Sequence, residues 1–156
     1  AHIESVDGTW AWYYNAFVNT HNRNPLDKIN DVFVNNILYN FEAGYTTHTS
    51  THFNHDIVNN YFVYGPKGSN PWFQVDKNQS IYASGNMIDT DRDGKLNGGP
   101  SNIYYYQGVG EKLAKPWSEL TTRCWWKNRL KRIRLLRASL TSIIFVQKLL
   151  RLASLT

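Results

Sequence analysis

Two apolar runs meet at an asparagine in residues 33–39, whose sequence is FVNNILY. The same order of β-branched or aromatic residues, asparagine and a second apolar segment occurs at residues 12–18 (WYYNAFV) and 57–63 (IVNNYFV), and more weakly at 82–88 (YASGNMI). Short runs of this composition are typical of β-strands. The sequence therefore predicts four pairs of short strands, with each pair divided by an asparagine.

The dividing asparagines, Asn15, Asn36, Asn60 and Asn86, are 21, 24 and 26 residues apart. This period is typical of one turn of a parallel β-solenoid. We expect each asparagine to adopt a left-handed φ at a corner and to hydrogen-bond to the asparagine of the next turn. An antiparallel sandwich with asparagine-rich turns also has short, evenly spaced strands, but an asparagine inside each apolar run favours the solenoid. The predicted fold class is all-β, a parallel β-helix of about five coils.

The charge of the chain is unevenly distributed along its 156 residues. The net charge is +5 and the mean hydropathy is −0.50, with 19% charged residues, which excludes a highly charged disordered chain. Residues 123–156 hold nine of the 17 Lys and Arg residues and none of the 12 Asp and Glu residues. Apolar residues recur at helical spacing from Leu130 to Ile144. We therefore predict a β-helix domain at 1–122 and a basic, amphipathic α-helical tail at 123–156.

The two ends of the chain carry no recognisable targeting segment. The longest apolar run, Ile143–Val146, is far shorter than the roughly 18 residues of a membrane span, so we expect none. Lys127–Arg137 could contact a nucleic acid or an anionic membrane, but it contains no nucleic-acid motif, so we expect neither partner. Because the chain opens almost directly into a strand without a cap, we expect a solenoid truncated at its N-terminus. We expect a monomer.

Five motifs together resemble one known family. The chain is similar, over roughly residues 9–122, to the pectate lyases of polysaccharide lyase family 1, and most of all to their secreted fungal pectate lyase C group. The motifs are THNRNP at 20–25, VNNILYN at 34–40, IVNNYF at 57–62, YYYQG at 104–108 and KPWS at 115–118. The resemblance implies a right-handed parallel β-helix that has further N-terminal coils in the family. The tail 123–156 does not resemble the family.

The resemblance also implies an activity and the residues that carry it. The family cleaves polygalacturonate, the acidic polysaccharide of pectin, by β-elimination, with Ca²⁺ stabilising the developing charge. Its base is the first arginine of an Arg-x-Pro-x-x-Arg motif, which Arg23 matches here, with Lys28 in place of the second arginine. Lysine keeps the charge but loses the planar fork that grips a carboxylate. Nearby cations would disfavour the guanidinium charge of the base, and His21 could bind sugar hydroxyls or a carboxylate.

A catalytically inactive, pectin-binding or structural β-helix is the alternative to a secreted lyase. The family holds its catalytic Ca²⁺ with aspartates that lie upstream of the segment this chain matches. Their absence from the sequence keeps this alternative open.

A second calcium site is predicted from residues 89–97, DTDRDGKLN. The segment resembles the start of an EF-hand loop, whose carboxylates at positions 1, 3 and 5 precede a glycine, a backbone carbonyl ligand and a polar residue. Position 12, which should be glutamate, is Pro100, so a plain Asp/Gly-rich turn remains the alternative. Calcium bound here would hold the loop in one conformation and would not contact the substrate. The predicted ligands are Asp89, Asp91, Asp93, Lys95 (through its carbonyl) and Asn97.

Two further patterns are weaker. His48, His52 and His55 have the spacing of a metal site on a helix, but the surrounding Thr and Ser residues disfavour a helix. We therefore expect the three side chains at the surface. Asn78 begins an N-glycosylation acceptor, Asn-Gln-Ser, which applies if the chain is secreted.

Overall fold

The computed structural model describes residues 1–103 and 110–118. The chain divides into two compact units, one made of Ala1–Arg92 with Asn97–Trp117 and the other of Asp93–Leu96 with Ser118–Thr156. The predicted tail helix and the boundary at residue 122 lie outside the described residues, as does the YYYQG motif at 104–108. The described part contains no helix long and apolar enough to cross a membrane.

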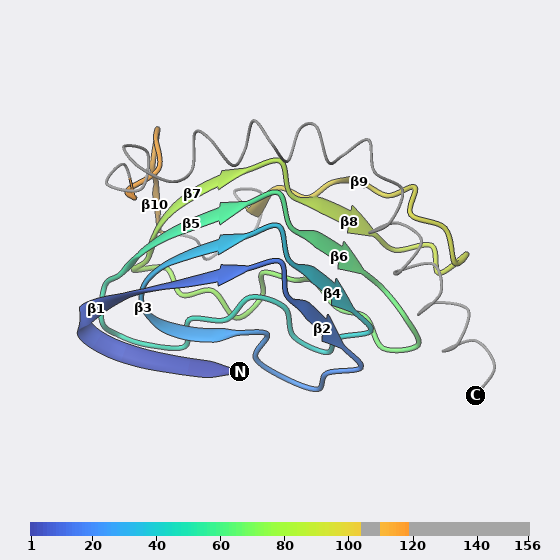
Figure 1. Cartoon of the computed structure of the whole chain (residues 1–156), viewed down its shortest axis with the longest axis horizontal. Helices are drawn as coiled ribbons and strands as arrows, with labels where there is room; N and C mark the ends of the chain where they lie inside the picture. Colours follow the sequence, from blue (N-terminus) through green and yellow to red (C-terminus); the bar gives the residue numbers. More distant parts are fainter. Residues whose placement is uncertain (104–109, 119–156) are drawn as a thin grey trace. The chain divides into compact units, whose positions relative to one another are not determined.

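The first unit contains two five-stranded sheets that run side by side (Figure 1). Neighbouring strands are parallel throughout, except that β9 lies antiparallel to β8. One sheet has β1 (His2–Tyr13), β3 (Leu26–Val34), β5 (Asn54–Val58), β7 (Ser80–Ser84) and β10 (Glu111–Lys112). The other has β2 (Ala16–Val18), β4 (Ile37–Tyr39), β6 (Tyr61–Val63), β8 (Met87–Asp89) and β9 (Gly99–Pro100).

Each predicted run forms one strand in each sheet, so the chain advances by one turn per run. Phe33 on β3 pairs in register with Ile57 on β5, and Ile57 pairs with Ala83 on β7. Phe33 and Ile57 are fully buried, because the side chains at these equivalent positions point into the solenoid. The parallel β-helix is therefore confirmed, and the parallel neighbours exclude the antiparallel sandwich.

The predicted asparagine ladder is present at the corner between the two sheets. The Oδ1 of Asn60 accepts hydrogen bonds from the backbone N of Asn36 at 2.9 Å and from its Nδ2 at 3.1 Å. Asn86 receives the same two bonds from Asn60, and Asn36 receives them from Asn15. The Nδ2 of Asn60 also donates to the carbonyl of Phe33 at 2.8 Å. The ladder thus satisfies buried amides and backbone groups in successive turns.

The left-handed backbone at this corner lies one residue earlier than the sequence predicted. The positive φ angles belong to Tyr14, Asn35, Asn59 and Gly85, at 55–67°, and not to the ladder asparagines that follow them. The reason is that each ladder residue directly precedes the next strand, where its side chain must point inward to meet the asparagines of the neighbouring turns. The preceding residue therefore makes the turn. An added Cβ at Gly85 would lie 2.1 Å from Asn59 Oδ1.

The first strand is longer than the sequence pattern indicated. The prediction began at residue 12, whereas β1 begins at His2 and pairs with β3 from His2↔Leu26 onward, with an irregularity between Glu4 and Thr9. Residues 2–8 show no run of apolar side chains. Residues 2–4 are held in the sheet by pairing with residues 26–28 of β3, and residues 5–8 form the irregularity before the next paired stretch. Backbone pairing leaves no signature in the side-chain pattern.

Candidate functional site

Arg23 lies in the loop that connects β2 to β3. Its side chain is exposed and its backbone has a φ of 62°, a conformation uncommon for residues other than glycine. The next residue fixes the loop: Asn24 donates from its backbone N to the carbonyl of Gly44 at 3.0 Å and from its Nδ2 to the carbonyl of Ala43 at 2.7 Å. The loop is therefore anchored on the following turn of the helix while Arg23 faces solvent.

His21, Glu42 and Lys67 form a charged cluster on three successive turns, here called the loop cluster. Glu42 accepts from Lys67 Nζ at 2.8 Å through Oε1 and pairs with His21 Nδ1 through Oε2. The hydrogen bond from Lys67 lowers the pKa of Glu42, and His21 adds to this effect. The loops that carry the cluster are also joined by the backbone, because Glu42 N donates to the carbonyl of His21 at 3.0 Å.

Asparagine side chains hold these three loops in line. The Nδ2 of Asn40 donates to Asn19 Oδ1 at 2.7 Å, and Asn40 Oδ1 accepts from the backbone N of Lys67 at 2.7 Å. Asn19 and Asn40 have φ angles of 54° and 53°. The second corner of the solenoid thus carries its own short ladder, which fixes the positions of His21 and Lys67 relative to each other.

Lys28 has a partner outside the loop cluster. Its Nζ lies 3.2 Å from Glu4 Oε2, and Glu4 and Lys28 are paired in register on β1 and β3. The side chain of Lys28 is 24% exposed. Because its partner Glu4 is 57% exposed, this ion pair contributes little to stability.

The predicted calcium ligands do not form a ready-made site. In the first unit, Asp89 is buried and its Oδ2 accepts from Asn97 N at 3.2 Å. In the short segment 93–96, Asp93 accepts from Lys95 N at 2.7 Å and lies 3.5 Å from Lys95 Nζ. Within residues 1–103 and 110–118, no group of three or more His, Cys, Asp or Glu side chains is placed to hold a metal ion. The described geometry therefore does not fit Ca²⁺ without rearrangement.

The three histidines of the 48–55 segment lie apart, and the prediction that all three are at the surface is wrong for His55. His48 is exposed with a φ of 42°, and His52 Nε2 lies 2.8 Å from Ser80 Oγ. His55 is fully buried on β5. The alternation of the strand turns its ring inward, where it meets buried polar partners that compensate for the loss of water.

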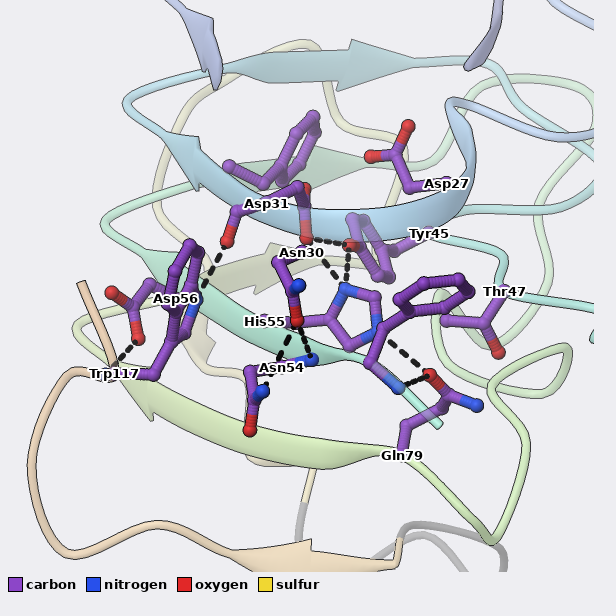
Figure 2. Close-up of polar contacts among 12 residues, drawn as sticks. Asp27, Asn30, Asp31, Tyr45, Thr47, Asn54, His55, Asp56, Gln79 and Trp117 are labelled. Carbon is purple, nitrogen blue, oxygen red and sulfur yellow. Dashed lines mark hydrogen bonds and ion pairs between the residues drawn. The ribbon is translucent and has the colours of Figure 1, made fainter. Parts of the chain in front are cut away.

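These partners form a buried polar cluster inside the β-helix (Figure 2). His55 Nδ1 lies 2.5 Å from Asp31 Oδ1, and Tyr45 OH lies 2.6 Å from the same oxygen. His55 Nε2 lies 2.9 Å from Gln79 Oε1. Asp27 lies near the start of β3, four residues before Asp31, and both of its oxygens are 3.0 Å from Trp12 Nε1. Sequence analysis missed this cluster, although the register that aligns residue 31 with residue 55 could have indicated it.

The predicted glycosylation site, Asn78, is exposed. Its Nδ2 donates to the carbonyl of Ser50 at 2.6 Å, and its Oδ1 accepts from Gln79 Nε2 at 2.8 Å. Gln79 and Ser80, the other two residues of the acceptor, are buried. Modification at Asn78 stays a prediction.

The first unit is therefore a parallel β-helix whose second corner carries the exposed Arg23 and the loop cluster of His21, Glu42 and Lys67. The chain is similar to proteins named probable pectate lyase C, which confirms the resemblance seen in the motifs. It is 34% identical over 100 residues to the one from Aspergillus flavus, covering 62% of this chain and 24% of the relative. It is 33% identical over 100 residues to that of Aspergillus fumigatus, and 36% identical over 91 residues to that of Aspergillus terreus.

The chain spans about a quarter of the length of these curated relatives, between 22% and 24%. No protein-family model matches the chain. No solved structure matches it significantly.

Proposed function

We propose that this chain acts as a secreted pectate lyase that cleaves an acidic polysaccharide, polygalacturonate, by β-elimination. The observation that carries the proposal is the position of Arg23. It is exposed, held at a φ of 62° ahead of Pro25, and follows His21 of the loop cluster by two residues. The similarity to proteins named probable pectate lyase C supports the same activity.

In the proposed reaction Arg23 is the base. It removes the proton from the carbon beside the uronate carboxylate, and the electron pair of that C–H bond forms a C=C double bond as the C–O bond of the glycosidic oxygen on the next ring carbon breaks. The departing sugar oxygen takes up a proton from water. Guanidinium groups normally keep their proton, so the site must disfavour the charged form. Neighbouring positive charge does this, and in this proposal Lys28 and a bound Ca²⁺ would supply it.

The proposed substrate contacts are Lys28, His21 and Lys67. Stacked turns of a β-solenoid repeat at about 4.8 Å, so His21 and Lys67, two turns apart with Glu42 between them, lie in a row along the axis of the solenoid. A polyuronate carries one carboxylate on each sugar and can meet this row with several of them. Glu42, which pairs with both His21 and Lys67, keeps the two side chains in place when no substrate is bound.

Calcium is proposed as the cofactor, and when bound it would stabilise the negative charge that develops on the uronate. A separate structural role is proposed for the 89–97 loop on the basis of its carboxylate spacing. Because Asp89 and Asp93 hold other partners, calcium binding there requires these carboxylates to turn toward the ion.

Calcium is expected to raise the melting temperature of the full chain, because a ligand that binds only the folded state stabilises it by mass action, by about 2.7 kcal/mol at a hundred times Kd. Replacing both Asp89 and Asp91 with Ala is expected to abolish this rise, as measured by thermal unfolding with and without chelator. Asp7→Ala, which removes an exposed carboxylate on β1, serves as the control and should keep the rise. An unchanged rise in the Asp89/Asp91 variant would place the ion elsewhere.

The activity itself is tested by the ultraviolet absorbance of the unsaturated product on polygalacturonate, with and without chelator. Absorbance that grows with time and is lost in Arg23→Lys supports the lyase. Binding of polygalacturonate without any product would instead support the second candidate, an inactive pectin-binding β-helix. Secretion, a monomeric state and glycosylation at Asn78 belong to the same proposal. Expression in a secreting host tests them through the presence of the protein in the medium, its molecular mass in solution and the loss of added mass in Asn78→Gln.

A further inference from the structure

The buried polar cluster of Figure 2 takes no part in the proposed site, yet its hydrogen bonds determine where its protons lie. Gln79 fixes the first of them. Its Oε1 accepts from the backbone N of Phe53 at 3.1 Å, while its Nε2 donates to the carbonyl of Thr51 at 2.9 Å. A backbone N–H can only donate, so the atom that faces His55 Nε2 is the amide oxygen. His55 must therefore carry a hydrogen on Nε2.

The other ring nitrogen then requires a second proton. His55 Nδ1 lies 2.5 Å from Asp31 Oδ1, and both atoms are acceptors when the imidazole is neutral and the carboxyl is ionised. The hydroxyl of Tyr45 has one hydrogen and can satisfy only one of them at a time, at 2.6 Å or 2.8 Å. Two facing lone pairs at 2.5 Å repel each other, so one proton lies between Asp31 and His55.

A further proton is required between the two carboxyl groups. Asp31 Oδ2 is buried and receives no hydrogen from any residue of the described chain. Asp27 is fully buried on the same strand as Asp31, and Trp12 Nε1 donates to both Asp27 oxygens at 3.0 Å. A protonated Asp27 would satisfy Asp31 Oδ2, whereas two ionised carboxylates would repel each other in the dry interior.

We propose that Asp27, Asp31 and His55 form a buried proton-holding cluster that makes the β-helix sensitive to alkaline pH. The cluster is electrically neutral only while it holds the two shared protons. Losing them leaves negative charge on Asp27 and Asp31, which are both fully buried, and burying unpaired charge is costly. Because both aspartates lie on β3, the strand that follows Arg23, the loss of these protons loosens the base of the proposed site.

Burial and the neighbouring charged groups also favour the protonated form of the two aspartates. Burial raises the pKa of Asp31 to about 7, and burial together with the charge of Asp31 raises the pKa of Asp27 well above its usual value. Asp56 on β5 opposes the ionisation of Asp31, and burial also raises the pKa of the Tyr45 hydroxyl. Burial lowers the pKa of His55, which disfavours a charged imidazolium in the Asp31–His55 pair.

The sign of the pH dependence follows from the protons bound in each state. Above about pH 6.5 the unfolded chain carries ionised aspartates and a neutral histidine, whereas the folded cluster keeps its protons. Unfolding then releases protons, so stability falls as pH rises through the folded pKa values of Asp31 and Asp27. Each retained proton lowers the folding equilibrium constant about ten-fold per pH unit. Below about pH 6.5, proton uptake by the unfolded His55 acts in the opposite sense.

Asp27→Asn tests the proposal because its amide copies the protonated carboxyl. Asparagine can donate to Asp31 Oδ2 and accept from Trp12 while having no proton to lose. The measurement is urea unfolding of the full chain between pH 6 and 9. For each pH unit, the factor by which the folding equilibrium constant decreases should be about ten-fold smaller in Asp27→Asn than in the wild type, because one proton fewer is released on unfolding.

The control variant is Asp76→Asn, which weakens hydrogen bonds from Thr47 Oγ1 and Thr49 N. It should lower stability at every pH and keep the wild-type slope, as expected for a merely structural change. An infrared band of protonated carboxyl in the wild type at pH 7, lost in Asp27→Asn, would support the proposal without any unfolding measurement. Equal slopes in the wild type and Asp27→Asn, or no such band, would overturn it.

Discussion

Arg23→Lys is expected to lower kcat on polygalacturonate by roughly 10²–10⁴-fold, the usual cost of removing a general base. The lysine keeps a positive charge at the same point of the loop, so binding of the anionic chain should change far less. The positive φ of Arg23 and the anchoring of Asn24 on Ala43 and Gly44 do not depend on the guanidinium. The fold of the loop should therefore persist. The measurement is the initial rate of unsaturated product formation over a range of substrate concentrations.

Lys67→Gln separates catalysis from binding in the same assay. It removes one cation of the loop cluster while Arg23 stays in place, so the expected effect is a higher KM with a smaller change in kcat. Lys77→Gln, which alters an exposed lysine in the segment before β7, should change neither. Equal losses of affinity and turnover in Arg23→Lys would identify Arg23 as an electrostatic anchor. Near-normal turnover would exclude it as the base.

Asn60→Ala is expected to destabilise the β-helix by about 3–5 kcal/mol, since each buried group left without its partner costs about 1–3 kcal/mol. The substitution leaves two backbone groups unpaired, the carbonyl of Phe33 and the N–H of Asn36. It also interrupts the ladder between Asn36 and Asn86. Such a loss is a large share of the 5–15 kcal/mol that typically stabilises a domain. The measurement is the decrease in the urea concentration at the unfolding midpoint.

Asn15→Ala is the matched control, because Asn15 is the first member of the ladder. Its side chain is partly exposed and makes one ladder bond, to Asn36 Oδ1, which the backbone N of residue 15 also satisfies. The expected cost is below about 1 kcal/mol. Similar losses in both variants would mean that the ladder contributes no more than ordinary surface hydrogen bonds.

The sequence by itself contained the repeat, and with it the fold. The asparagines at 15, 36, 60 and 86 recur once per turn because every turn must satisfy the same corner, so their spacing identified the parallel β-helix and the ladder. The placement of the left-handed residue was wrong by one position, since a list of residue types does not say which of two adjacent residues turns the chain. Backbone pairing of residues 2–4 and 9–11 was missed for a similar reason.

The site was only partly contained in the sequence. Arg23, His21 and Lys28 were predicted from one continuous motif, and their exposure is consistent with contact to a ligand. Glu42 and Lys67 come from other turns, and only the stacking of the loops brings them beside His21. The same holds inside the helix, where Asp31 and His55 are 24 residues apart and meet because the register of β3 and β5 makes them neighbours.

The sequence therefore determined the features that repeat along the chain or lie within a few residues, namely the strand pairs, the ladder and the Arg23 motif. The tertiary structure alone decided which side chains meet across turns, because a solenoid places residues one period apart within hydrogen-bonding distance. It also decided what is buried. The strand alternation turns His55 into the interior, where the absence of water, and not the identity of the residue, ties its proton to Asp31.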